Sequence, residues 1–370
     1  MGAIPPILSM TDPLYGAITS GIEREQEEPP QVTTWLNDVY KLGNPDQVNW
    51  SARRTINPEF YRDIVLPSMY GFLEKKIRKI TESDNMNALI GLSGGLDSTV
   101  ASYITAAAMQ EARKSGRARQ ANLGLINFRG FEDNDTQAIA EDLKQKYEAV
   151  RLRYIETDIS GIRKSLTKTT AGLVAKLDGE VIEFPGELTT RVICSLVNEI
   201  GARAGYATID TTNGTEFILG EFSVGLGYDL ALLDDLYKSS VFALAELIGV
   251  PPFVTNIQPR NTAYGKRTKP ELYFGSLPKV TPRQVFEVLD TVVYWIYERN
   301  KSPEEVSRAL EHNVEFTRKI KRRIDNQKHR GITPHFCVET HEIIHQNNTG
   351  LSDEETRGII EKSMLVDKFG

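Results

Sequence analysis

The sequence predicts an α/β protein with a doubly wound parallel sheet, helices on both faces and a helical C-terminal region. Short apolar runs alternate with helical patterns from about residue 88 onward, and repeated strand–helix order is typical of a parallel sheet. Beyond Pro282 the strand-like runs stop, and apolar residues recur at helical spacing. In a sheet of this kind the ligand is expected at the carboxyl ends of the strands.

The predicted elements follow one another in a regular order. An amphipathic helix over Tyr61–Ile80 precedes the first strand, because its apolar residues recur at helical intervals. A buried strand is expected at Ala88–Leu92, and further strands at Leu123–Phe128, Leu152–Ile155 and Tyr206–Thr211. Helices are expected at Thr99–Arg113, Thr136–Tyr147, Leu188–Ala204 and Tyr237–Ile248, with a further helical face over Val285–Ile296. Capping boxes at Ser302…Glu305 and Ser352…Glu355 predict two more helix starts.

These elements divide the chain into three predicted regions. Residues 1–60 are rich in Pro, Asp, Asn and Glu and are expected to form an N-terminal extension. Residues 61–275 hold the α/β core. Residues 276–370 form a helical C-terminal region that belongs to the same catalytic unit.

Composition argues against several classes of protein. The 370 residues include 44 basic and 50 acidic side chains, a net charge of -6, so nothing favours binding to nucleic acid or to an anionic membrane. We expect no signal peptide, and no segment has the ~20 apolar residues that a membrane span needs. The only cysteines are Cys194 and Cys337, so we expect no disulfide scaffold and predict a cytoplasmic location.

A glycine-rich turn joins the first strand to the helix after it, and its sequence is Ser93-Gly94-Gly95-Leu96-Asp97-Ser98. Two glycines allow a tight turn and bring backbone N–H groups close to a phosphate. The serine hydroxyls add donors, and the helix N-terminus adds a favourable dipole. Asp97 would repel a phosphate unless a cation lay between them, which implies Mg²⁺. The alternative is an ordinary strand–helix turn with Asp97 as a cap.

The hexapeptide matches Ser-Gly-Gly-x-Asp-Ser, the signature of the PP-loop superfamily of N-type ATP pyrophosphatases. This superfamily cleaves ATP between the α and β phosphates, and it includes synthetases of NAD, GMP, asparagine and argininosuccinate as well as tRNA thiolases. The stretch from Arg191 to Lys238 resembles NAD synthetase in particular. The family's Thr-x-Asn-x-x-Glu corresponds to Thr211–Glu216, and its Asp-Ile/Leu-x-Pro-Leu and Leu-x-Lys correspond to Asp229–Leu233 and Leu236–Lys238. The chain is identified as a divergent member of the ammonia-dependent NAD synthetase family.

This resemblance implies an adenine nucleotide alpha hydrolase-like fold and an ATP-dependent ligase that forms a carbon–nitrogen bond. It would adenylate the carboxylate of deamido-NAD, transfer ammonia to it, and release AMP and pyrophosphate. The residues implied for ATP are Ser93, Gly94, Gly95, Leu96, Asp97, Ser98, Thr211, Lys238 and Thr262, of which Asp97 and Lys238 would act in catalysis. Asp97 and Glu216 would bind Mg²⁺. The residues implied for deamido-NAD are Arg191, Asp229, Lys328 and His329.

The sequence also departs from the family where the pyridine nucleotide should bind. The loop at Ser223–Tyr228 is about two residues shorter than usual, Val224 stands near a lysine position, and Leu232 replaces a proline. The changed loop favours, as an alternative, amidation of another carboxylic acid. Two further alternatives are a non-catalytic nucleotide-binding regulator and sulfur transfer through Cys194 and Cys337. The residues before the core are too few for an amidase domain, so ammonia is expected free or from a separate glutaminase. We expect a homodimer.

Three of the implied residues also have a purely structural interpretation. Lys238 follows Asp234-Asp235 and could form a solvated ion pair with them. Arg191 could pair with Glu187, four residues earlier on the same helical face. Glu216 could be an acidic residue in the first turn of a helix.

Two clusters near the C-terminus could carry other chemistry. His341-Glu342-Ile343-Ile344-His345 has the spacing of zinc proteases, and His335, Cys337, His341 and His345 together have side chains that suit a structural zinc site. We interpret them instead as part of a C-terminal lid or dimer arm. A basic cluster comprises Arg318, Lys319, Lys321, Arg322, Arg323, Lys328 and Arg330. It is either a solvated helix face or a contact to a substrate phosphate.

Overall fold

The computed structural model describes residues 58–129, 135–176, 185–221, 227–256, 281–311 and 314–329. A five-stranded parallel sheet lies at the centre, with strand order β3-β2-β1-β4-β5. The strands are β1 Met86–Gly91, β2 Ala121–Arg129, β3 Arg151–Asp158, β4 Ala207–Asp210 and β5 Leu230–Ala231. Ile90 of β1 pairs with Leu125 of β2 and with Ile209 of β4, which fixes the register at the centre of the sheet.

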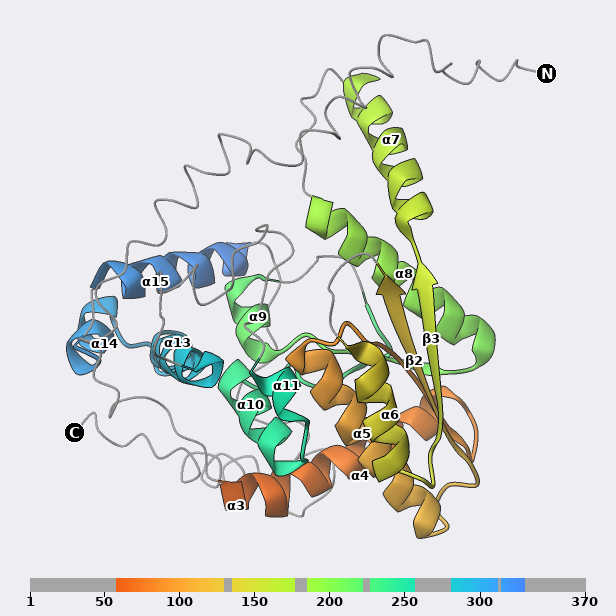
Figure 1. Cartoon of the computed structure of the whole chain (residues 1–370). Helices are drawn as coiled ribbons and strands as arrows, with labels where there is room; N and C mark the ends of the chain where they lie inside the picture. Colours follow the sequence, from red (N-terminus) through yellow and green to blue (C-terminus); the bar gives the residue numbers. More distant parts are fainter. Residues whose placement is uncertain are drawn as a thin grey trace.

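Helices account for most of the remaining described residues (Figure 1). They are α3 Pro58–Phe60, the π-helix η3 Tyr61–Val65, α4 Leu66–Ile80, α5 Leu96–Lys114, α6 Thr136–Lys146, α7 Ser160–Lys176, α8 Pro185–Ala204, α9 Gly214–Leu219, α10 Lys238–Leu247, α11 Pro252–Thr255, α13 Pro282–Tyr297, α14 Pro303–Ala309 and α15 Val314–His329. No helix in these described stretches is both long enough and apolar enough to cross a membrane.

Helices cover both faces of the sheet, as the sequence predicts. Successive residues of a strand point to opposite faces. Ala88 and Ile90 of β1 accordingly lie in a large core shared with α4, α5, α10 and α13, whereas Leu89 lies in a smaller core with Val192 and Val197 of α8. The doubly wound α/β fold class is therefore confirmed.

The order of the strands determines where a ligand can bind. The chain runs from β1 outward to β2 and β3, and then returns to place β4 on the other side of β1. The connections after β1 and β4 thus lead away in opposite directions, and a crevice forms between the carboxyl ends of these two strands. The turn at Ser93–Ser98 follows β1, and the segment Thr211–Glu216 follows β4. Both predicted ATP segments therefore lie at this crevice.

The C-terminal helices extend the core beyond α10. Helix α13 packs against α9 and α10, and α15 packs against α9, α13 and α14. In Figure 1 these helices form a group on the side of α10 that lies away from β3. Thr281 with Gln284, and Ser302 with Glu305, form capping boxes at the starts of α13 and α14; the second was predicted. The predicted domain boundary at 275/276 and the box at Ser352 fall outside the described residues.

Among the described elements, helices α7, α9 and α11 and strand β5 were not predicted from the sequence. Helix α7 has weak apolar periodicity, and Ile162, Leu166 and Leu173 on it remain exposed, so no buried stripe was visible in the sequence. Helix α9 and strand β5 are too short to show a period. The predicted strands and helices that lie in the described residues are all present, with ends that differ by a few residues.

Candidate active site

The turn after β1 has the backbone of a phosphate-binding loop. Gly94 has a φ of 79°, in the left-handed region that favours glycine. Gly95 is the N-cap of α5, with extended backbone angles and no side-chain cap. The N–H groups in the first turn of a helix lack partners within the helix, and at α5 no side chain of the N-cap takes their place. This helix start can therefore receive an anion.

Hydrogen bonds of the exposed Ser93 and the buried Ser98 hold the turn together. Ser98 is 3% exposed, and its hydroxyl donates to the Gly95 carbonyl at 3.2 Å. The Ser93 N–H donates to the Ser98 hydroxyl at 3.2 Å, and the Gly95 N–H donates to the Ser93 hydroxyl at 3.2 Å. Leu96 is buried in the core, so only its backbone can face a ligand. These hydrogen bonds hold the shape of the loop, and the contact of the two hydroxyls with phosphate stays a prediction.

Substituting Gly94 should weaken ATP binding through strain in this loop. An Ala at a φ of 79° costs about 1–2 kcal/mol. Because the free loop of Gly94→Ala can relax out of this strained conformation and ATP binding must restore it, we expect the dissociation constant for ATP to rise about tenfold, since ~1.4 kcal/mol is tenfold in affinity. Isothermal calorimetry measures the change. The matched control is Gly116→Ala, because Gly116 has a φ of 75° and an added Cβ there meets nothing within 4 Å. The control should lose similar stability and keep its ATP affinity; equal affinity losses in both variants would contradict the role of the loop.

Asp97, Lys238 and Asn213 meet at the crevice from three different helices. The Lys238 ammonium forms an ion pair with Asp97 Oδ2, and Asn213 Nδ2 donates to Asp97 Oδ1 at 3.1 Å. Asp97 lies in the first turn of α5, Lys238 begins α10, and Asn213 is the N-cap of α9. The Lys238 side chain is 3% exposed and that of Asp97 18%. The alternative of a solvated ion pair for Lys238 is therefore wrong. The sequence analysis did not single out Asn213, although it lies inside the Thr211–Glu216 motif.

Glu216 lies next to this cluster through its contacts with Asn213. The Glu216 N–H donates to Asn213 Oδ1 at 3.0 Å, and Glu216 Oε2 accepts from the Asn213 N–H at 3.5 Å, which completes a capping box. Asn213 thus touches both predicted Mg²⁺ ligands. Among the described residues no group of three or more His, Cys, Asp and Glu side chains could hold a metal. Two carboxylates beside a phosphate loop fit Mg²⁺, which takes one or two carboxylates and fills the rest of its shell with phosphates and water.

Of the four residues predicted for deamido-NAD, Arg191 lies on α8 and Asp229 directly before β5. Arg191 is exposed on α8, one turn before Cys194. The Tyr228 hydroxyl donates to Cys194 Sγ at 2.9 Å, which holds the segment before β5 against that helix. Asp229 is exposed, and its Oδ2 accepts from the Thr208 N–H at 2.8 Å and from the Thr208 hydroxyl at 3.0 Å. Asp229 therefore anchors this segment to β4.

Asp210 of β4 and Cys194 of α8 are two largely buried ionisable groups that interact with each other. Burial raises the pKa of the Asp210 carboxyl at the end of β4, against hydrogen bonds from Thr212 that lower it. Burial likewise raises the pKa of the Cys194 thiol. A thiol with a raised pKa is a poor nucleophile, which disfavours the sulfur-transfer alternative. Thr211 directly follows Asp210, at the carboxyl end of β4 as predicted.

The basic cluster on α15 is largely neutralised by acidic neighbours. Arg318 pairs with Glu304, Lys321 with Asp325, Arg322 with Glu315, and Arg323 with the almost fully buried Glu221. These ion pairs favour the solvated helix face for Arg318, Lys321 and Arg322, whereas the Arg323–Glu221 pair is largely buried. Lys328 and His329 form the last turn of α15. Thr262, Arg330, His335, Cys337, His341 and His345 fall outside the described residues.

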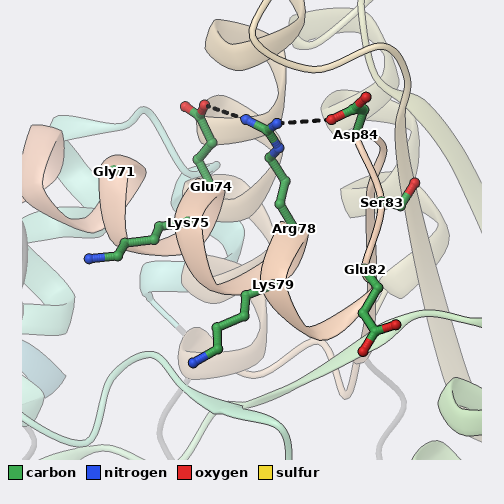
Figure 2. A pocket seen from close by; sticks show the side chains of 8 residues that line it. All are labelled: Gly71, Glu74, Lys75, Arg78, Lys79, Glu82, Ser83 and Asp84. Carbon is green, nitrogen blue, oxygen red and sulfur yellow. Dashed lines mark hydrogen bonds and ion pairs between the residues drawn. The ribbon is translucent and has the colours of Figure 1, made fainter.

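A hollow of about 640 Å³ lies on α4, away from this crevice (Figure 2). Arg78 is at its centre and pairs with Glu74 and Asp84. Its lining residues end at Asp84, just before β1 begins at Met86. The hollow is therefore at the amino edge of the sheet, opposite the phosphate loop, and we assign it no part in nucleotide binding.

Comparison with known proteins agrees with this geometry. Residues 66–334 match the sequence model of the NAD synthase family. The NH(3)-dependent NAD(+) synthetase of Sulfolobus acidocaldarius is 25% identical over 284 residues, which cover 75% of this chain and 92% of that protein. The protein of the same name from Pyrococcus furiosus is 24% identical over 268 residues, covering 70% of this chain and 93% of that protein.

Solved structures share the fold. An NMN synthetase from Francisella tularensis has a TM-score of 0.52 at 18% identity, over 76% of this chain and 100% of that chain. An NAD+ synthetase from Burkholderia pseudomallei has a TM-score of 0.51 at 17% identity, over 75% of this chain and 93% of that chain. The family match spans the phosphate loop, Asn213, Glu216 and Lys238. With its parallel sheet and with these residues gathered at one crevice, the chain belongs to the NAD synthase family.

Proposed function

We propose that this protein is an ammonia-dependent NAD synthetase. It joins ammonia to the nicotinate carboxylate of deamido-NAD and converts ATP to AMP and pyrophosphate. The observation that carries the proposal is the buried Asp97–Lys238 pair, which Asn213 joins to Glu216 beside the phosphate loop. Family membership and the names of the archaeal relatives support the choice of reaction.

The reaction has two steps, and charge is the main obstacle in the first. The substrate carboxylate attacks the α-phosphorus of ATP, and pyrophosphate leaves. Ammonia then attacks the acyl carbon of the adenylate, and AMP leaves with the acyl carbon–oxygen bond broken. Lys238 and the start of α5 supply the fixed positive charge and N–H donors that offset the two approaching anions. Bound Mg²⁺, held by Asp97 and Glu216, would supply further charge neutralisation at the phosphates.

The direct test uses the purified full-length chain with ATP, Mg²⁺, ammonium and deamido-NAD. Mass spectrometry should detect NAD, and chromatography should show AMP and pyrophosphate in equal amounts. ADP with phosphate would assign the protein to another class of ATP-using enzyme. The control without deamido-NAD should release no more than background pyrophosphate.

A different carboxylic acid is the second candidate substrate. The N–H and the hydroxyl of Thr208 both donate to Asp229 Oδ2. The Asp229 carboxylate is therefore partly engaged in holding β4 to the segment before β5. The shortened loop at Ser223–Tyr228 lies at the same place in the sequence. Nicotinate mononucleotide carries the same pyridine carboxylate without the adenylate half, and it is the first competitor to assay. Pyrophosphate release with that acid but not with deamido-NAD would establish the alternative substrate.

The homodimer, the cytoplasmic location and the source of ammonia remain predictions of the sequence. Free ammonium or a separate glutaminase would serve the same chemistry.

A further inference from the structure

We infer that Asp290 is a positioning residue for Lys238, and that it acts from α13 by holding the start of α10. This inference rests on the proposed function in one respect, namely that Lys238 contacts ATP. Asp290 places a carboxylate among apolar side chains of the core. Asp290 is 0% exposed, and Leu289, Val292 and Val293 beside it on α13 are fully buried. A buried carboxylate is costly unless hydrogen bonds satisfy it.

The two oxygens of Asp290 bind two different helices. The Thr215 hydroxyl of α9 donates to Oδ1 at 2.7 Å, and the Ser239 N–H of α10 donates to Oδ2 at 2.6 Å. Asp290 is 75 residues from Thr215 and 51 from Ser239 along the chain. It therefore joins the C-terminal helices to two elements at the crevice.

Thr215 carries the connection one step further, to Lys238 itself. The Lys238 N–H donates to the Thr215 hydroxyl oxygen at 2.9 Å. A hydroxyl has one proton and two lone pairs. Because the Thr215 proton goes to Asp290, its oxygen is free to accept from Lys238. Asp290 and Thr215 thus bind the N–H groups of Lys238 and Ser239, the first two residues of α10.

These N–H groups would otherwise lack partners. The first four N–H groups of a helix have no acceptor within it, and the N-cap of α10, Tyr237, provides no side-chain cap. A carboxylate at this end also interacts favourably with the helix dipole. Asp290 and Thr215 together replace the missing cap and fix where α10 begins. That position determines where the Lys238 side chain starts.

Helix α13 also contacts the far end of the Lys238 side chain. The Lys238 ammonium lies 5.8 Å from the centre of the Phe286 ring, and Phe286 is one turn before Asp290 on α13. The same helix thus binds the Ser239 N–H, next to Lys238, through Asp290 and contacts the Lys238 ammonium through Phe286. The Lys238 side chain is therefore held both at its backbone and at its ammonium, which pairs with Asp97.

The experiment compares Asp290→Asn, Thr215→Val and Thr215→Ser with the wild type. Valine keeps the shape of threonine and lacks the hydroxyl, whereas serine keeps the hydroxyl. An asparagine cannot accept hydrogen bonds on both sides, so one contact is lost. We expect Asp290→Asn and Thr215→Val each to lower kcat about 10- to 100-fold, and Thr215→Ser to stay within about threefold of the wild type. The double variant should lose little more than the worse single one, because both act through one connection.

Thr291→Val is the matched control for a general disturbance of α13. Thr291 is also 0% exposed, and its hydroxyl donates at 2.6 Å to the Glu287 carbonyl in its own helix. The kcat of Thr291→Val should stay within about threefold of the wild-type value, even if the melting temperature of this variant falls. If Asp290→Asn does not fold at the assay temperature, the Thr215→Val and Thr215→Ser pair carries the comparison.

The dissociation constant of ATP, measured by calorimetry without the second substrate, provides a readout independent of amidation. It should rise about tenfold in Thr215→Val and stay near the wild-type value in Thr215→Ser and Thr291→Val. If the wild type makes no amide, the proposed function fails and this binding comparison still tests the inference. Wild-type ATP affinity and kcat in folded Thr215→Val would overturn it, as would equal losses in Thr291→Val.

Discussion

Asp97→Asn should lower turnover about a thousandfold, equivalent to roughly 4 kcal/mol in the activation free energy. The substitution removes a predicted Mg²⁺ ligand and the negative charge that pairs with Lys238. It should also destabilise the fold by about 3–5 kcal/mol, because it leaves a buried ammonium without its partner. Lys238 is only 3% exposed, so water cannot replace the lost carboxylate. Pyrophosphate release at saturating ATP and Mg²⁺, together with urea denaturation, measures both effects.

Asp84→Asn is the control for removing an aspartate from an ion pair. Asp84 is 82% exposed and pairs with Arg78 at 3.1 Å. A solvated pair of this kind contributes about 0–1 kcal/mol, so this variant should keep both its stability and its turnover. Undiminished turnover in Asp97→Asn would refute the assignment of Asp97, and undiminished stability would refute the view that Lys238 depends on it.

Lys238→Met should lower turnover by a similar factor of about a thousand with little loss of stability. Methionine fills a similar volume without a buried charge, and replacing a buried ionic group by an apolar one is often neutral or stabilising. Asp97 is more accessible than Lys238, at 18% exposed, and it keeps its hydrogen bond from Asn213. We therefore expect the two single variants to be equally inactive and unequally stable.

The double variant Asp97→Asn/Lys238→Met separates the two properties. It should recover most of the stability that Asp97→Asn loses, because no unpaired charge remains, and it should stay inactive. Lys301→Met is the control for removing a lysine from an ion pair, because Lys301 is 38% exposed and pairs with Glu305 at the surface. A double variant less stable than Asp97→Asn alone would contradict the direct coupling of the two charges.

Much of the fold was predictable because periodicity reports which residues face the core. The strand at Ala88–Leu92, the Gly-Gly turn and the helix after it are each encoded locally, so the phosphate loop was found with its neighbours. Helix α7 was missed because its apolar side chains are not buried. Residues that meet only in three dimensions were harder to assign, as Asp97 and Lys238 show, since only the family resemblance placed both in one site.

The structural roles of Asn213 and Asp290 could not be predicted from local patterns. Asn213 stands in a motif that the sequence analysis quoted, yet its contact with Asp97 depends on how α9 meets α5. Asp290 did leave a signal, because it interrupts the apolar run over Val285–Ile296. A charged residue in a buried stripe is rare unless it is paired. Its partners, however, lie on α9 and α10 and could only be read from the structure.

The pairing of Asp97 with Lys238 joins positions 141 residues apart in the chain. A contact of such long sequence separation costs loop-closure entropy before it contributes stability, so it forms slowly. The nucleotide site is therefore complete only once α5 and α10 have met, although its loop is encoded near the beginning of the core. A chain in which α5 and α10 have not met would contain the phosphate loop without the Asp97–Lys238 pair. ATP should therefore act as a selective stabiliser of the finished fold, raising its melting temperature by mass action while leaving the early folding steps unaffected.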